Sequence, residues 1–246
     1  MRCQPFAVRR FWKLPQFLLK NKKSKSNNMD AVLKNISTNM IERYSNRYKK
    51  LGRNIKTLGW GSVEQQLYRF EQTLQTGVDF SDKRILDIGC GFGDYYDYIT
   101  AQRKIEIQSY QGYDLNDDLI NAAQQEYIND SKSAFQVSNI LEKKVEEPVA
   151  DIGVMLGVLN LNFKEEYDNY AYSKKIITNA FSLVKDYLIV DFLSTNLDSS
   201  YPKEDFIFYH NPAQMLEFAF SLSENVSLKH DYASIPQKEF MLIIKK

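Results

Sequence analysis

The sequence is poor in the residues that build several common kinds of site. Only two cysteines are present, Cys3 and Cys90, and they lie far apart in the 246-residue chain. Two cysteines at that separation form neither a disulfide framework nor a cysteine-based metal site, so we expect no metal. No uninterrupted apolar run approaches the roughly 20 residues that a membrane-spanning helix requires. These absences predict a cytoplasmic protein in a reducing compartment, with no membrane span.

Acidic residues are missing from the first 28 positions. That segment holds eight of the 32 basic residues, which leaves 24 basic against 31 acidic residues in the rest of the chain. A mildly acidic body argues against a broad nucleic-acid surface, because such surfaces need clustered positive charge. The basic head has three interpretations: an organelle transit peptide, a membrane-surface helix or a disordered extension. Pro5 and Pro15 would interrupt a helix, which favours the extension.

Helical and strand patterns alternate after this head. They predict helices over 30–50, 63–74, 94–103, 117–127, 165–185 and 211–222, the second capped by Ser62. They predict strands over 84–89, 107–114, 134–139, 150–158, 186–193, 226–232 and 239–246. Apolar strands that alternate with helices are typical of an α/β fold, a doubly wound parallel sheet with helices on both faces. The last two strands are joined by the short segment ASIPQK, which requires an antiparallel pair.

The stretch ILDIGCGFGDYY, residues 85–96, ends a buried strand in a glycine-rich turn. Its glycines have the spacing GxGxG, and Asp94 occupies the place of the third glycine of a dinucleotide-binding turn. An aspartate at this helix start would repel a pyrophosphate, and the Walker pattern is absent as well. The turn therefore allows a ligand to approach the backbone closely but is unsuited to a phosphate.

The segment LDIGCGFG resembles motif I of the class I S-adenosylmethionine (SAM) dependent methyltransferases, and the resemblance covers roughly residues 80–246. It implies a Rossmann-like, three-layer αβα domain whose seven-stranded sheet is mostly parallel, with the antiparallel last strand inserted between strands five and six. It implies SAM as the cofactor and S-adenosylhomocysteine as its product. We therefore expect a basic extension (1–28), an N-terminal helical lid (29–80) and a methyltransferase domain (81–246).

Three positions near the turn have chemistry that suits SAM, which carries an ammonium and no phosphate. Asp87 ends an apolar strand and suits the cationic amino end, directly or through water, although it could instead bond the turn amides. Gly89, Cys90 and Gly91 bring backbone against the cofactor, because the glycines remove Cβ atoms where it crosses the strand end. Asp114 lies 21 residues after the last glycine of the turn. An acid near this spacing reaches two ribose hydroxyls.

The resemblance implies further contacts. Leu115 corresponds to the family's apolar contact to adenine. Asn139 and Ile140 lie where the family often has an aspartate followed by an apolar residue, and an asparagine can still accept a hydrogen bond from the adenine amino group. Leu156 lies where the chain passes beneath the methionine part. The residues that follow it, with Asn160, form the floor of the acceptor site.

The segment before the core is polar, aromatic and punctuated by glycines, as a lid over a cofactor would be. We expect Trp60 and Ser62 to cover the methionine end, and Tyr44, Arg47 and Tyr48 to line the entrance. The alternative is that Trp60 fills a hydrophobic gap and that Arg47 is a solvated helix charge.

A general base is needed only when the acceptor is protonated at the working pH. The candidates are His210, in the loop after strand five beside the aromatic Tyr209 of a possible acceptor wall, and His230 on the sixth strand. The favoured function is transfer of a methyl group to an oxygen or nitrogen of a small-molecule or sugar-like acceptor by in-line displacement. The alternatives are a protein- or RNA-directed methyltransferase and a SAM-binding protein without catalysis.

Overall fold

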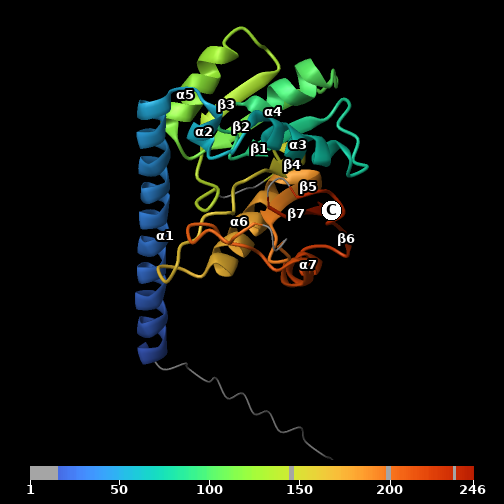
Figure 1. The fold of residues 1–246 in the computed structure, drawn as a ribbon. Coiled ribbons are helices and arrows are strands. Elements are labelled where there is room, and N and C mark those ends of the chain that lie inside the picture. The colour runs from blue at the N-terminus through green and yellow to red at the C-terminus, as the bar shows by residue number, and fades with distance from the viewer. Residues whose placement is uncertain (1–15, 144–146, 198–200, 235–236) are drawn as a thin grey trace, which may run out of the picture.

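The computed structural model describes residues 16–143, 147–197, 201–234 and 237–246, with side chains from residue 29 on. Seven strands form one sheet in the order β3-β2-β1-β4-β5-β7-β6 (Figure 1). Strands β1 to β5 run parallel to one another, whereas β7 is antiparallel to both β5 and β6. The doubly wound sheet with an inserted antiparallel last strand is therefore confirmed. The strands are β1 (Arg84–Ile88), β2 (Ser109–Asp114), β3 (Ser133–Val137), β4 (Ala150–Met155), β5 (Val184–Leu193), β6 (Asn225–Lys229) and β7 (Glu239–Lys245).

The helices within the described residues cover both faces of this sheet (Figure 1). As predicted, the third of them is capped by Ser62, whose hydroxyl accepts a hydrogen bond from the backbone N–H of Gln65 at 3.3 Å. The helices are α1 (Gln16–Leu51), α2 (Ile55–Leu58), α3 (Val63–Leu74), α4 (Asp94–Asp97), the π-helix η1 (Tyr98–Gln102), α5 (Asp117–Glu126), α6 (Asn169–Leu183) and α7 (Pro212–Phe220).

Two helices differ from their predicted extent. The helix predicted over 94–103 is divided, since α4 passes directly into the π-helical turns of η1. The helix predicted over 165–185 begins only at α6, because the side chain of Asp168 caps it and accepts a hydrogen bond from the backbone N–H of Tyr170 at 2.8 Å. Capping side chains of this kind satisfy the free N–H groups of a first turn and so fix where a helix starts.

The largest difference concerns the basic head. Helix α1 starts at Gln16, well before the predicted start at residue 30, so the second half of the predicted disordered extension is helical. The start directly follows Pro15, a residue that a helix interior does not tolerate. The first half of the predicted extension, residues 1–15, lies outside the described residues. Helices α1, α2 and α3 account for the segment predicted as a helical lid.

Helix α1 lies along one side of the domain (Figure 1) and is joined to it by apolar and polar contacts. Leu33 and Ile36 are buried in the main core cluster. The side-chain amide of Asn116, just before α5, donates to the carbonyl of Ile41 at 3.0 Å and to the hydroxyl of Ser45 at 2.9 Å. These contacts hold the C-terminal half of α1 beside the carboxyl ends of the strands.

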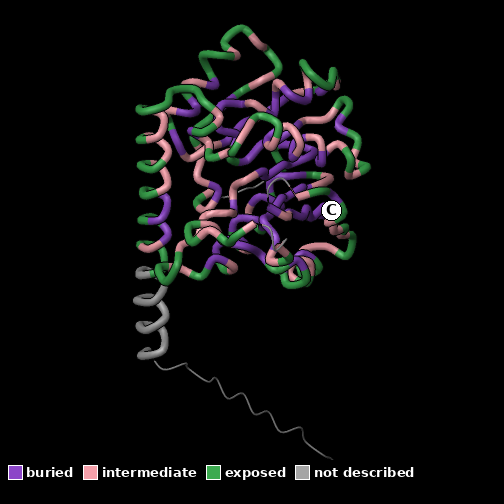
Figure 2. Tube along the Cα trace, in the orientation of Figure 1, coloured by how far each residue is buried: buried purple, intermediate pink, exposed green. Residues whose placement is uncertain are grey.

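The core lies on both faces of the sheet, as its alternation of side chains requires. Leu86 and Val190 point into a cluster shared with α1, α6 and α7. Ile85 and Ile189, their chain neighbours, point into a cluster shared with α3, α4, η1 and α5. Figure 2 shows the result, with the strands buried in the middle and the outer sides of the helices exposed.

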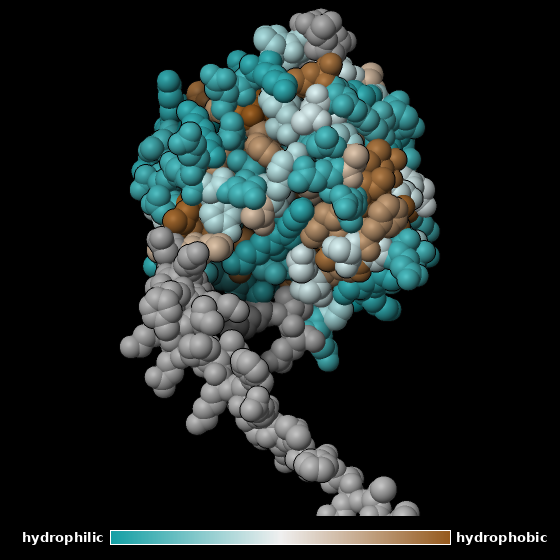
Figure 3. All heavy atoms as spheres, turned by 90° about the horizontal axis from the view of Figure 1, so that it is seen from below, coloured by the Kyte–Doolittle hydropathy of each residue, from teal (hydrophilic) through white to brown (hydrophobic). Residues whose placement is uncertain are grey.

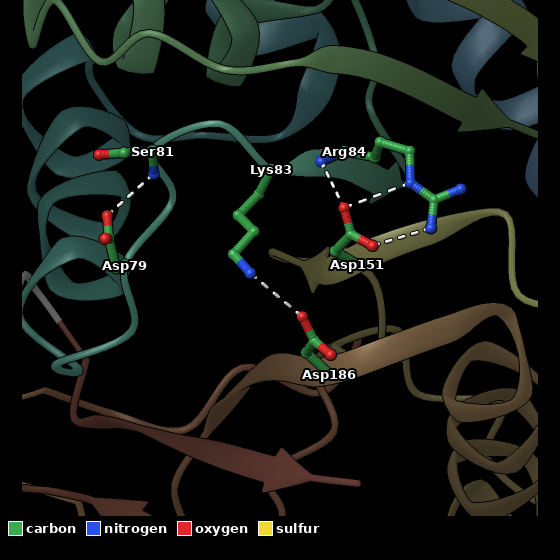
Figure 4. Close-up of polar contacts among 6 residues, drawn as sticks. All are labelled: Asp79, Ser81, Lys83, Arg84, Asp151 and Asp186. Carbon is green, nitrogen blue, oxygen red and sulfur yellow. Dashed lines mark hydrogen bonds and ion pairs between the residues drawn. The ribbon is translucent and has the colours of Figure 1, made fainter.

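The amino-terminal ends of three strands are joined by ion pairs (Figure 4). Arg84 of β1 forms a two-armed pair with Asp151 of β4, in which Nη2 lies 2.8 Å from Oδ1 and Nε lies 3.2 Å from Oδ2. Lys83 reaches Asp186 of β5, with 3.3 Å between Nζ and Oδ2. The hydrogen bonds from Arg84 hold the pKa of the Asp151 carboxyl below its usual value. At this end of the sheet, these charged side chains are therefore paired with one another.

The surface is predominantly polar where it can be seen. Figure 3 shows the face below the view of Figure 1, on which hydrophilic residues cover most of the visible part and hydrophobic residues form smaller patches. No helix within the described ranges has both the length and the apolar character needed to cross a bilayer. Nor do the described residues gather three or more His, Cys, Asp or Glu side chains into a group that could hold a metal ion.

Candidate functional site

A cavity of about 410 Å³ lies at the carboxyl ends of the parallel strands, the edge at which open α/β sheets bind ligands. Residues that follow β1, β2 and β4 line one side, and α1 with the segment from α2 to α3 lines the other. Most predicted site residues line it: Tyr44, Arg47, Trp60, Asp87, Gly89, Cys90, Gly91, Asp114, Leu115, Asn139, Ile140, Leu156 and Asn160. Five do not: Tyr48, Ser62, Tyr209, His210 and His230.

The glycine turn presents its backbone to this cavity. Gly89 and Gly91 have φ angles of 80° and 54°, the left-handed region that side chains disfavour. A Cβ atom at Gly89 would lie 2.5 Å from Cγ2 of Val158, and one at Gly91 would lie 2.9 Å from Cδ2 of Leu58. Any larger residue at either position would therefore both strain the backbone and displace a side chain of the cavity wall.

Asp114, at the end of β2, is fixed against the turn. Its Oδ2 accepts a hydrogen bond from the backbone N–H of Gly91 at 3.0 Å, and its Oδ1 accepts one from that of Asn116 at 2.9 Å. Burial raises the pKa of its carboxyl, and these backbone hydrogen bonds oppose the shift. Each oxygen keeps a further lone pair, so the carboxylate can accept hydrogen bonds from two ligand hydroxyls.

Asp87, near the end of β1, is a buried acid without a compensating cation. It is 3% exposed, and its described partner is the hydroxyl of Tyr110, which donates to Oδ2. Among the described residues, no Lys, Arg or His forms an ion pair with it. Burial raises the pKa of Asp87 to about 7, against the opposing effect of the Tyr110 hydrogen bond. The ionised carboxylate is therefore suited to a cationic ligand.

Asn139 and Ile140 line the cavity after β3. Oδ1 of Asn139 accepts a hydrogen bond from the backbone N–H of Leu141 at 3.1 Å, and its Nδ2 donates to Glu142 at 3.0 Å. These local bonds orient the amide and leave one lone pair on Oδ1 for a ligand amino group. Ile140 is buried and supplies an apolar wall beside it.

Trp60 borders the cavity on the lid side. A Cβ atom at Gly157, just after β4, would lie 3.1 Å from Cη2 of Trp60, so the indole covers the end of that strand. Trp60 also packs edge-to-face on Phe70 and under the guanidinium of Arg69, which lies 4.7 Å from the ring centroid. The ring therefore both covers the site and fills a gap. Ser62, predicted beside it, is used instead to cap α3.

A buried polar cluster behind Trp60 was not predicted from the sequence. Arg69 of α3 pairs with Glu239 of β7, and Asp191 of β5 accepts a hydrogen bond from the backbone N–H of Gly157 at 2.6 Å. Burial raises the pKa of Glu239 to about 7 and that of Asp191 to about 6. The signal in the sequence was an acidic residue inside each of two otherwise apolar strands. The partners of these acids lie on other helices and strands, and a sequence pattern does not show which elements meet in the fold.

The predicted entrance residues divide into two groups. Tyr44 and Arg47 line the cavity, as does Asn160, the residue predicted in the floor of the acceptor site. Asn160 is held by its Oδ1, which accepts a hydrogen bond from the backbone N–H of Leu193 at 3.2 Å. Tyr48 packs against Phe92 instead, with ring centroids 5.8 Å apart.

Tyr209 does not line the cavity, in contrast to its predicted role in an acceptor wall. Its hydroxyl accepts hydrogen bonds from Nε2 of Gln237 at 2.7 Å and from the backbone N–H of Glu204 at 3.2 Å. These bonds fix the fold of its own loop. Other residues of that loop line the cavity: Tyr201, Glu204, Phe206 and Ile207.

Neither histidine is placed to act as a base at the cavity. His210 is 0% exposed, its Nε2 lies 2.9 Å from the hydroxyl of Ser173, and burial lowers its pKa to about 3. His230 follows the end of β6 and packs against Phe240, and burial lowers its pKa as well. The prediction of a histidine base is therefore not supported, because neither ring lines the cavity.

No protein-family model and no curated protein matches the sequence. Solved structures do match. The SAM-bound magnesium protoporphyrin IX methyltransferase from Synechocystis PCC 6803 is 13% identical, with 84% of this chain and 96% of that chain covered and a TM-score of 0.59.

Two further methyltransferase structures resemble it about equally. Phosphoethanolamine N-methyltransferase 1 from Haemonchus contortus, with phosphoethanolamine and S-adenosylhomocysteine, is 11% identical, over 86% of this chain and 50% of that one, with a TM-score of 0.58. The small RNA methyltransferase HEN1 is 16% identical, over 75% and 26%, with a TM-score of 0.58. At such identities the likeness establishes the fold, which is that of the class I methyltransferases.

Proposed function

We propose that this protein is a SAM-dependent methyltransferase that transfers a methyl group to an oxygen or nitrogen of a small-molecule acceptor. The observation that carries the proposal is a pair of carboxylates, the buried Asp87 and the half-buried Asp114, on either side of a glycine turn in which Gly89 and Gly91 have no room for side chains. One acid lacks a cation, and the other is free to accept two hydroxyls. That combination suits a ligand with a cationic end and a ribose.

The cavity offers a place for each part of the cofactor. Asp114 would bind the ribose hydroxyls, and Ile140 with the amide of Asn139 would bind adenine. Asp87 would lie toward the ammonium, and Trp60 would cover the methionine end. The cavity volume of about 410 Å³ lies within the range of small-molecule sites, about 300–1,000 Å³.

SAM, when bound, supplies a methyl group on a sulfonium: an acceptor lone pair forms the new bond to carbon as the carbon–sulfur bond breaks and its electron pair stays on sulfur, which leaves S-adenosylhomocysteine. The chain's own contribution is to align the acceptor and to exclude water. The lid of α1, α2 and Trp60 provides that cover over the strand ends. An acceptor that is deprotonated at the working pH needs no further base.

Two alternatives remain as outcomes of the test. HEN1, a structural neighbour, is by its name a small RNA methyltransferase. The acidic body of this chain favours a small molecule over an RNA, because RNA binding depends on clustered positive charge. The third possibility, cofactor binding without transfer, shares every cofactor contact with the enzyme and differs only in turnover.

The test uses the purified full chain. Calorimetry with SAM and S-adenosylhomocysteine measures binding, and incubation with methyl-labelled SAM plus a metabolite extract, total RNA or total protein measures transfer. We expect binding of both ligands and label in the small-molecule fraction. Label in RNA or protein alone would replace the small-molecule acceptor with a macromolecule. Binding without label in any fraction would support the non-catalytic alternative, and no binding would end the proposal.

A further inference from the structure

The cavity carries negative charge at one end and positive charge at the other. Asp87 and Asp114 lie at the strand ends, whereas Arg43 and Arg47 approach from α1. In the proposed function the cationic methionine end lies against the acids, so the guanidinium groups remain on the acceptor side. A cavity with this asymmetry selects the sign of the charge that enters it.

The two arginines are one helical turn apart and are restrained by different walls of the opening. A guanidinium nitrogen of Arg47 donates a hydrogen bond to the carbonyl oxygen of Lys56 in α2. The guanidinium of Arg43 lies over the ring of Phe206, 5.9 Å from its centroid. Residues i and i+4 of a helix are neighbours on its surface, so both groups can reach one ligand group. Their restraint reduces the entropy lost when a ligand binds.

The chain itself does not neutralise this pair. Among the described residues, no carboxylate lies within ion-pair distance of Arg43 or Arg47. Glu204, the acid on the facing loop, instead accepts a hydrogen bond from the hydroxyl of Tyr201 at 2.9 Å. A guanidinium has five N–H donors in a planar fork that matches the oxygens of a carboxylate or phosphate. Most of these donors remain for a ligand.

The wall between the arginines and the strand ends is apolar. Met40 and Ile41 of α1 and Tyr172 and Ile176 of α6 line the cavity. The hydroxyl of Tyr172 contacts Sδ of Met40 at 3.8 Å, so it is engaged within the wall. A ligand that fills this space needs an apolar body as well as a charged group.

We propose that the methyl acceptor is an organic anion, whose carboxylate or phosphate is bound by Arg43 and Arg47 and whose apolar body lies against Met40, Tyr172 and Ile176. This proposal rests on the methyltransferase function proposed above. The anionic group anchors the acceptor, and the oxygen or nitrogen that receives the methyl group is presented toward the strand ends. An acceptor that is only cationic would bring positive charge against two guanidinium groups, so the site discriminates against it.

The first experiment identifies the acceptor. The full chain is incubated with methyl-labelled SAM and a metabolite extract, and labelled products are identified by mass spectrometry, with one portion of extract treated with phosphatase beforehand. We expect the parent acceptor to contain a carboxylate or a phosphate. Loss of the product after phosphatase treatment assigns a phosphate, and its persistence assigns a carboxylate. An acceptor without any acidic group would overturn the proposal while leaving the methyltransferase function intact.

The second experiment removes each guanidinium in turn. Arg43→Gln and Arg47→Gln should each raise the KM for the labelled acceptor about 10-fold, the scale of one lost charge-assisted hydrogen bond, with the affinity for S-adenosylhomocysteine unchanged. Lys49→Gln, an exposed charge on the same helix, is the matched control and should change neither value. A KM within about twofold of the parent value in both arginine variants would overturn the proposal.

The two proposals fail in different ways. If no extract fraction is labelled and S-adenosylhomocysteine does not bind, the methyltransferase function itself is wrong and the acceptor proposal falls with it. If methyl transfer occurs and both arginine variants keep the parent KM for the acceptor, only the acceptor proposal is wrong. A rise of KM with ionic strength in the parent protein, reduced in the Arg47→Gln variant, would support the ionic contact further.

Discussion

At the amino-terminal end of the sheet, Asp151 is paired with Arg84. At the carboxyl-terminal end, the buried Asp87 and the half-buried Asp114 form no ion pair with a cation among the described residues. The pKa values of the aspartates are shifted in opposite directions at the two ends. Hydrogen bonds from Arg84 lower the pKa of Asp151, whereas burial raises the pKa values of Asp87 and Asp114. At the amino-terminal end the chain's own arginine pairs with the aspartate, whereas at the carboxyl-terminal end a cationic ligand could pair with the free carboxylates.

The two ends therefore affect folding stability with opposite sign as pH changes. An unfolded aspartate has a pKa of about 4, so between about pH 4 and pH 7 the folded chain holds the Asp87 proton more tightly than the unfolded chain. Stability from this group falls as pH rises through that window. The contribution of Asp151 is present above the unfolded pKa and is lost as pH falls through its lowered folded value. A cationic ligand at the carboxyl-terminal end would offset the loss of folding stability that the ionised Asp87 causes.

The largest expected effect is at Asp114. Asp114→Ala should weaken binding of S-adenosylhomocysteine about 100-fold or more, because two charge-assisted hydrogen bonds, at about 1.5–3 kcal/mol each, are lost together. Calorimetry measures the affinity, and a thermal melt shows that the variant is folded. Asp117→Ala, an exposed acid in the first turn of α5, is the matched control and should bind normally. Binding within threefold of the parent by a folded Asp114→Ala would remove the ribose assignment.

Asp87→Asn should change stability and binding in opposite directions. The amide keeps an oxygen for the Tyr110 hydroxyl and removes the buried charge, so the Tm at pH 8 should rise by about 2–4 °C. The affinity for S-adenosylhomocysteine should fall about 10-fold, because the ammonium loses its carboxylate. Scanning fluorimetry and calorimetry measure the two effects. A lower Tm together with unchanged affinity would show that Asp87 serves the fold and not the ligand.

Asp151→Asn should give the reverse result at the opposite end. Loss of a partly exposed ion pair should lower the Tm at pH 7 by about 2–4 °C, equivalent to about 1 kcal/mol, and leave the affinity for S-adenosylhomocysteine unchanged. The difference from the parent should shrink as pH falls below about 4, where the aspartate of the unfolded chain is protonated, and vanish below the lowered pKa of the folded Asp151. Weakened cofactor binding in this variant would mean that the two ends are coupled through the strands.

His210→Gln should have the smallest effect on activity. The ring lies in the core, does not line the cavity and has a pKa of about 3, so it is uncharged at neutral pH. Methyl transfer should stay within about twofold of the parent between pH 6 and pH 9, while the Tm falls because a buried contact to Ser173 is altered. The loss of an inflection from the pH–rate profile would restore His210 as a base.

Local patterns predicted the parts of this protein that depend on neighbours in sequence. The cap at Ser62, the strand that carries Asp87 and the acid at Asp114 follow from short-range rules of capping, alternation and spacing. Predictions from the sequence were wrong where a loop side chain could point either toward the cavity or toward the core. Tyr209 and His210 lie in a loop on the ligand-binding side of the sheet, yet neither lines the cavity, and each bonds a residue far from it in sequence, Gln237 and Ser173 respectively.

By itself, the sequence determined the order of strands and helices, the antiparallel end of the sheet and the glycine turn, because each depends on the periodicity of apolar residues and on the conformations that glycine adopts. The tertiary structure decided which side chains contact one another and which charged groups form ion pairs. Arg69 pairs with Glu239 across 170 positions, Trp60 covers Gly157, and Arg43 faces the cavity without an acid beside it. Such choices depend on packing between distant elements, where burial alone can turn an ordinary aspartate into an acid whose pKa is about 7.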